Sequence, residues 1–234
     1  MAELRFFFGT MGSGKCTQAL QIRHNLAARG LSVIITTQLD RQVGKVSSRL
    51  GVAAEAEIVD PHVDLYELAS AAHRRDSLDA MVCDEAQFYE PRQVDQLGRV
   101  ADELDVEVYA FGLLTSFQGE LFPGTKRLLE LADVRSELQV EARCWCGARA
   151  THNARLVNGV QVYSGALKVV GDTALDDPDE APDVSYDLRC RRHWHEELRR
   201  QQGDQLELID RDDRVADDRV QREEAAATAR QSVS

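Results

Sequence analysis

The segment from Gly9 to Cys16, GTMGSGKC, constrains this chain more than any other feature. It directly follows the apolar run LRFFF and directly precedes a helical pattern. Glycines let a loop fold tightly enough for successive backbone N–H groups to point at one anion, and the N-terminus of the following helix adds a favourable potential. The order of strand, glycine-rich loop and helix therefore predicts a phosphate-binding P-loop.

The rest of the first 140 residues repeats short apolar runs alternating with helical patterns, which predicts an α/β fold with a parallel sheet flanked by helices. The expected strands are 4–8, 32–36, 57–59, 80–83 and 107–111, and the expected helices are 18–29, which Gly30 closes, and 65–74. Residues 38–51 carry two glycines and a serine pair, so a loop or lid is expected there.

From about residue 143 the pattern changes to short strands and turns, with a tight hairpin turn expected at Asn158-Gly159. Residues 172–183 contain six acidic residues and two prolines without periodicity, which predicts a mobile insertion. The last part of the chain is charged and then alanine-rich, without an apolar stripe. We therefore expect a P-loop domain at 1–142, a small β subdomain at 143–195, and a disordered tail at 196–234.

The P-loop supplies most of the expected phosphate contacts. The residues expected to bind ATP here are Gly9, Thr10, Met11, Gly12, Ser13, Gly14, Lys15 and Cys16. Lys15 offers a cation to the β- and γ-phosphate oxygens. The last position of a P-loop ordinarily holds Ser or Thr, whose hydroxyl binds Mg²⁺, and Cys16 departs from that pattern. Because Cys16 lies at a helix N-terminus beside Lys15, its thiol pKa is expected to be lowered.

A second element supports the P-loop assignment. The stretch LDAMVCDEAQF, residues 78–88, is an apolar strand that ends in Asp84 and Glu85. In phosphoryl transfer to a hydroxyl, one such carboxylate binds Mg²⁺ and another accepts the alcohol proton, so we assign Asp84 to Mg²⁺ and Glu85 to the general base. Ala86 and Gln87 complete the expected ATP and Mg²⁺ set. An acidic pair after a strand is also common at strand ends that simply face solvent. The P-loop earlier in the chain favours the metal-binding and proton-accepting roles instead.

Two short pairs of metal-binding residue types lie about 45 residues apart. Cys144 and Cys146 form the first pair, and Cys190 and His193 form the second. Three cysteines and one histidine suit tetrahedral Zn²⁺ and leave no open position, so a structural zinc site is expected. His195 competes with His193 for the fourth position, and unrelated buried cysteines are the alternative.

The net charge of the chain disfavours some classes of binding partner. The formal net charge is −12, whereas neutralising a nucleic acid or an anionic membrane takes a surplus of Lys and Arg on one face. This disfavours a P-loop motor ATPase that acts on nucleic acid. No apolar stretch approaches the ~20 residues that cross a bilayer, and the first residues do not resemble a signal peptide, so a cytoplasmic protein without membrane contact is expected.

Taken in order, these motifs resemble the thymidine kinases shared by human cytosol and many bacteria. The resemblance spans about residues 4 to 195 and includes FGLLTSFQGELFPG at 111–124 and, as in the bacterial branch, GKVSSRLG at 44–51. It implies that Glu85 is the catalytic base and that Arg41 approaches the phosphates. It also implies a lasso loop tied to the zinc subdomain, and a nucleoside pocket formed by Phe88, Phe117, Leu167, Lys168, Val169, Val170, Gly171 and Tyr186.

The resemblance further implies ATP and thymidine as substrates, dTTP as a feedback inhibitor, and a homotetramer or dimer. Cys16 departs from the family pattern, as do Leu114 and Ser116, which stand where bacterial relatives usually have Arg and Asp. The lasso is also lengthened by the acidic insertion. A regulatory nucleotide-binding protein of the same fold, with weakened catalysis, is therefore the alternative to an enzyme, although Lys15, Asp84 and Glu85 favour the enzyme.

Overall fold

The computed structural model describes residues 1–38, 45–47, 53–138, 141–167 and 183–197. The chain divides into two compact units, Met1–Arg191 and Arg192–Ser234. The sheets and numbered helices below belong to the first unit. In the second unit, residues 192–197 are helical.

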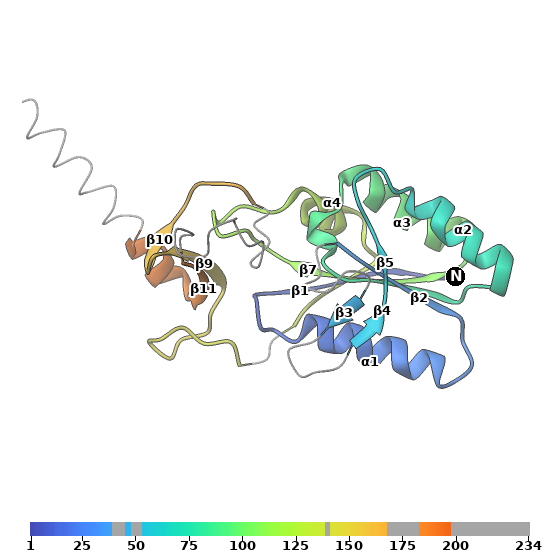
Figure 1. Cartoon of the computed structure of the whole chain (residues 1–234), viewed down its shortest axis with the longest axis horizontal. Coiled ribbons are helices and arrows are strands. Elements are labelled where there is room, and N and C mark those ends of the chain that lie inside the picture. The colour runs from blue at the N-terminus through green and yellow to red at the C-terminus, as the bar shows by residue number, and fades with distance from the viewer. Residues whose placement is uncertain (39–44, 48–52, 139–140, 168–182, 198–234) are drawn as a thin grey trace, which may run out of the picture. The chain divides into compact units, whose positions relative to one another are not determined.

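A parallel sheet forms the centre of the first unit (Figure 1), which confirms the expected α/β class. Its spatial order is β5 (Glu57–Ile58), β2 (Val33–Thr37), β6 (Ala80–Cys83), β7 (Glu107–Leu113), β1 (Leu4–Gly9) and β8 (Val134–Glu137), and each neighbouring pair runs parallel. Carboxyl ends of parallel strands meet at one edge. The P-loop after β1 and Asp84 after β6 therefore emerge at the same edge, with β7 between them.

Helices cover both faces of this sheet (Figure 1). Helix α1 (Lys15–Ala27) packs on one face, and α2 (Leu65–Asp76), α3 (Pro91–Leu104) and α4 (Pro123–Leu131) pack on the other. Side chains alternate along each strand. On β7, Val108 and Ala110 therefore enter the larger core under α2 to α4, while Phe111 enters the smaller core under α1.

The observed elements differ from the expected ones at several positions. Helix α1 begins at Lys15, three residues before the expected start at 18, because it continues directly from the P-loop. Helices α3 and α4 and strand β8 were not predicted. The expected loop 38–51 contains β3 (Lys45–Ser47), which pairs antiparallel with β4 (Ala53–Glu55) because Val46 is fully buried in the α1 core.

A separate antiparallel sheet follows in the chain, in the order β10 (Val160–Val162), β9 (His152–Val157) and β11 (Val184–Arg189). Asn158 and Gly159 join β9 to β10 with φ angles of 50° and 80°. Positive φ at both central residues is what a two-residue hairpin turn requires, and the predicted hairpin is confirmed. Among the described residues, no helix has the length and apolar character of a membrane span.

Candidate active site

The P-loop has the backbone shape that its glycines predict. Gly14, the residue before α1, has φ of 84°, which a residue with a side chain adopts only with strain. A Cβ at Gly9 would lie 2.5 Å from Ser13 Oγ and 2.8 Å from the Leu138 carbonyl oxygen, so only glycine fits there. These two positions hold the loop tightly against the N-terminus of α1, where an anion is favoured.

Lys15 is buried at the start of α1. Its Nζ donates to the Thr10 carbonyl oxygen at 2.8 Å and lies 3.4 Å from Ser13 Oγ. The ammonium group therefore lies across the loop. This places a positive charge among the backbone groups that are expected to hold phosphate.

Asp84 and Glu85 lie at the carboxyl end of β6, and the fold brings both to the P-loop. One ligand atom from each of Cys16, Asp84 and Glu85 lies within 4.8 Å of the others. Asp84 is buried, with 3% of its surface exposed, and its Oδ1 accepts the Glu85 backbone N–H at 3.0 Å. Residues about 70 positions apart in the sequence thus form one polar cluster.

Burial raises the pKa of two groups in this cluster, Asp84 and Cys16. Burial, and then the nearby charge of Glu85, raise the pKa of Asp84 from 3.8 to about 7. The thiol pKa of Cys16 is raised as well, first by burial and then by the charges of Asp84 and Glu85. The prediction of a lowered Cys16 pKa is therefore wrong, because burial and the two carboxylates outweigh the charge of Lys15.

Glu85 adopts an unusual backbone conformation, with φ of 55°. A non-glycine residue in this region is strained, and such strain concentrates at functional sites. Its carboxylate accepts a hydrogen bond from Nε2 of Gln87, and Oε1 of that fully buried side chain accepts the Leu113 N–H at 3.0 Å. Gln87 thus fixes the direction of Glu85, while Ala86 packs in the larger core.

The donor chemistry of the cluster suits Mg²⁺ only in part. Mg²⁺ prefers oxygen ligands, which Asp84 and Glu85 supply. The Cys16 sulfur is a poor ligand for so hard a cation. The carboxylates fit the ion that a kinase uses with ATP, whereas the thiol leaves the usual hydroxyl position without an oxygen.

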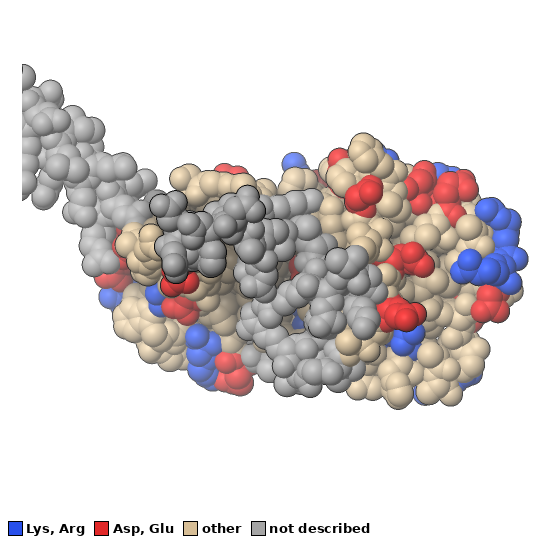
Figure 2. Space-filling model, viewed as in Figure 1, with Lys and Arg blue, Asp and Glu red and all other residues tan. Residues whose placement is uncertain are grey.

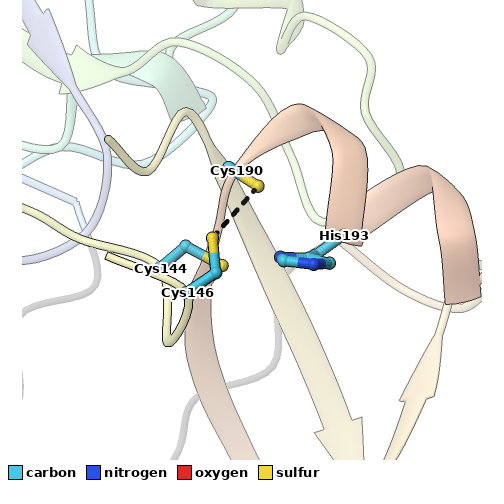
Figure 3. A group of neighbouring side chains, drawn as sticks. All are labelled: Cys144, Cys146, Cys190 and His193. Carbon is cyan, nitrogen blue, oxygen red and sulfur yellow. Dashed lines mark hydrogen bonds between the residues drawn. The ribbon is translucent and has the colours of Figure 1, made fainter. Parts of the chain in front are cut away.

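The four expected zinc ligands lie together (Figure 3). One ligand atom from each of Cys144, Cys146, Cys190 and His193 lies within 4.8 Å of the others. The Cys146 and Cys190 sulfur atoms are 3.9 Å apart. A tetrahedral Zn²⁺ with Zn–S bonds of about 2.3 Å separates two sulfur ligands by about 3.8 Å. The spacing and the donor set therefore fit a zinc ion.

Those expected nucleoside-pocket residues that the structure describes lie in two groups, one around Phe122 and one around Arg155. Phe88 packs edge-on against Phe122, with ring centroids 5.4 Å apart. Phe117 and Tyr186 both contact Arg155, which also donates to the Leu167 carbonyl oxygen at 3.5 Å. Arg41, Lys168, Val169, Val170 and Gly171 lie outside the described residues.

The sequence patterns did not indicate two residues that lie near the site. Asn153 binds the backbone of Met11 in the P-loop, and Arg155 stacks on Phe117. The available signal is the polar pair in HNARLV, residues 152–157, where two side chains on one face of a short strand are polar and both are buried.

Comparison with known proteins decides the family. The family model described as thymidine kinase matches residues 2–194. The chain belongs to the thymidine kinase family. A thymidine kinase of Streptomyces coelicolor is 55% identical over 82% of this chain and 88% of its own length. Those of Cutibacterium acnes and Ruegeria pomeroyi are 46% and 38% identical, over 82% and 84% of this chain and 88% and 95% of theirs. The predicted membership is confirmed.

Proposed function

We propose that this protein transfers the γ-phosphate of ATP to the 5′-hydroxyl of thymidine, giving dTMP and ADP. The observation that carries the proposal is the convergence of Lys15 with Asp84 and Glu85 at one edge of the parallel sheet, in a chain of this family. Phosphoryl transfer needs positioned groups and neutralised charge more than covalent chemistry. This cluster supplies a cation, a metal-binding carboxylate and a proton acceptor.

Each residue of the cluster has a distinct role in this proposal. Asp84 holds Mg²⁺, which neutralises charge on the β- and γ-phosphates when bound. Lys15 balances charge on the same phosphates. Glu85, directed by Gln87, accepts the proton of the 5′-hydroxyl. Arg41 approaches the phosphates from the segment that precedes β3.

The nucleoside side of the proposal depends on aromatic and apolar groups. Phe88, Phe117 and Tyr186 line the pyrimidine pocket, and backbone groups of the stretch 167–171 bind the polar edge of the base. Cys144, Cys146, Cys190 and His193 would hold a Zn²⁺ that orders the small subdomain, proposed at 143–195. By analogy with the family, a cytoplasmic homotetramer or dimer with dTTP feedback is part of this proposal.

The charge of this chain does not favour a nucleic acid as its partner. The formal charge is −12, and Figure 2 shows acidic and basic side chains interspersed over the described part of one face, without a continuous basic stripe. The regulatory alternative is favoured by Cys16, which puts a thiol in place of a hydroxyl, and by Leu114, which stands where bacterial relatives usually have Arg.

A coupled ADP-release assay over a nucleoside panel separates these functions. We expect thymidine to stimulate ADP release from ATP and Mg²⁺, and deoxycytidine and dTMP not to do so. Equal stimulation by deoxycytidine contradicts the specificity. ATP binding without stimulation by any nucleoside supports the regulatory alternative, and stimulation by DNA supports the motor ATPase.

A further inference from the structure

Strand β9 carries two polar side chains on one buried face. Asn153 and Arg155 are two residues apart, so they project to the same side of the strand. Their exposed fractions are only 3% and 4%. Burying an amide or a guanidinium group costs stability unless its polar atoms are bonded. The partners of these two side chains therefore indicate what this face of β9 holds in place.

Asn153 joins the P-loop to the segment that follows β7. Its Oδ1 accepts the backbone N–H of Met11 at 2.9 Å, and its Nδ2 donates to the Thr115 carbonyl oxygen at 3.3 Å. Met11 lies between Thr10, whose carbonyl oxygen accepts from Lys15, and Gly12. The side-chain amide of Asn153 thus ties the P-loop, at Met11, to the segment after β7, at Thr115.

Arg155 holds the nucleoside side in a similar way. Its guanidinium carbon lies 3.8 Å from the centroid of the Phe117 ring, and its Nε donates to the Tyr186 hydroxyl at 2.9 Å. Its remaining nitrogens donate to the carbonyl oxygens of Ala166 at 2.8 Å and Leu167 at 3.5 Å. Among the described residues, no carboxylate lies within ion-pair distance of Arg155, so backbone carbonyls and two aromatic rings hold this cation.

We propose that Asn153 and Arg155 are positioning residues that brace the two substrate sites from one strand. Asn153 sets the P-loop for the nucleotide, and Arg155 sets Phe117 and Leu167 for the nucleoside. The inference rests on the proposed function for the identity of the nucleoside. It adds that the two halves of the brace act on different substrates.

Amide hydrogen exchange tests the brace itself on the zinc-loaded full chain. In the wild type, the Met11 amide is protected because it donates to Asn153. Asn153→Leu removes the acceptor and speeds Met11 exchange, whereas Asn153→Asp keeps an acceptor and keeps most of the protection. Arg155→Met leaves Met11 protected. Unchanged Met11 exchange in Asn153→Leu overturns the first half of the brace.

Titration calorimetry then measures binding of thymidine and of a non-hydrolysable ATP analogue with Mg²⁺. Misplacing a reacting group by about 1 Å can cost on the order of 100-fold in rate, and we expect a smaller loss for binding alone. Asn153→Leu should raise the Kd for the analogue about tenfold and that for thymidine less than about twofold. Arg155→Met should show the reverse, and should raise the thymidine KM while leaving kcat within about twofold.

Matched variants separate positioning from general damage. Arg155→Lys keeps the charge but cannot present a planar fork to two carbonyls and a ring, so its thymidine Kd should also rise. It serves as the test if Arg155→Met does not fold. Arg135→Met removes an exposed arginine that donates to the Leu129 carbonyl and should change neither Kd. A wild-type thymidine Kd in Arg155→Lys overturns the proposal. An equal rise of the Kd for the ATP analogue and the Kd for thymidine, in Asn153→Leu or in Arg155→Met, overturns it as well. A wild-type chain that binds the analogue but not thymidine contradicts the proposed function instead, while Met11 exchange still decides the Asn153 half of the brace.

Discussion

Replacing Asp84 with asparagine should make the ligand-free protein more stable. Folding raises the pKa of Asp84 from 3.8 to about 7, mainly by burial. A carboxyl group whose pKa is raised on folding stabilises the folded chain below the unfolded value, and that contribution is lost as the pH rises through the folded value. At neutral and higher pH the folded wild type therefore carries a buried charge that Asp84→Asn lacks.

The size of the effect follows from the pKa values. Each change of one in pKa corresponds to about 1.4 kcal/mol, so the penalty is on the order of 2 kcal/mol at pH 5 and on the order of 4 kcal/mol at pH 8. For a chain of this size, 1 kcal/mol moves Tm by about 2–4 °C. Asp84→Asn should therefore melt about 8–16 °C above the wild type at pH 8 and only about 4–8 °C above it at pH 5.

Thermal unfolding of zinc-loaded protein, without added Mg²⁺ or ATP, measures this difference. Asp102→Asn, at an exposed position on α3, is the control and should not change Tm at either pH. Mg²⁺ with ATP should stabilise the wild type more than Asp84→Asn, because the variant lacks the metal-binding carboxylate. If Asp84→Asn is no more stable than the wild type at pH 8, the carboxylate is not a buried charge that needs a cation.

Three further variants and one modification experiment test other parts of the molecule. Cys16→Ser should raise kcat or lower the Mg²⁺ requirement about tenfold, because it restores an oxygen ligand, and unchanged kinetics would show that this side chain is not at the metal. The raised pKa of Cys16 also predicts slow alkylation near neutral pH, which mass spectrometry can follow against the exposed Cys146 in zinc-free protein. The double variant Cys144→Ser, Cys190→Ser should lose one Zn²⁺ per chain in elemental analysis, and retention of the metal would contradict the assigned ligands. Gly124→Ala should lower Tm markedly, since its Cβ would lie 2.6 Å from the Tyr89 carbonyl oxygen, and an unchanged Tm would contradict that contact.

The parts of the site that sequence reasoning predicted are those with local causes. The P-loop depends on glycines within eight residues, and the hairpin depends on Asn158 and Gly159. Strand β6 could be predicted because four consecutive apolar residues, AMVC, precede Asp84. In each case the residues that force the conformation are neighbours in the chain.

The parts that were missed depend on distant contacts. The Cys16 pKa is raised first by burial and then by Asp84 and Glu85, about 70 residues away in the chain, whereas the local sequence shows only Lys15 and the helix N-terminus. Strand β3 forms because Val46 reaches the α1 core, which its glycine- and serine-containing surroundings do not indicate. Asn153 and Arg155 acquire their roles only when the fold brings β9 beside the P-loop and Phe117.

Product analysis of the Glu85→Gln variant beside the wild type tests the central claim most directly. The substitution removes the proton acceptor with little change in shape, and a general base contributes about 10²- to 10⁴-fold. With ATP, Mg²⁺ and thymidine, the wild type should form thymidine 5′-monophosphate and ADP in equal amounts, as chromatography and mass spectrometry can quantify. Glu85→Gln should bind ATP normally and form product at least about 100-fold more slowly. Wild-type ADP release without the nucleotide product, or a Glu85→Gln variant that keeps more than about a tenth of the wild-type kcat, would contradict the assignment.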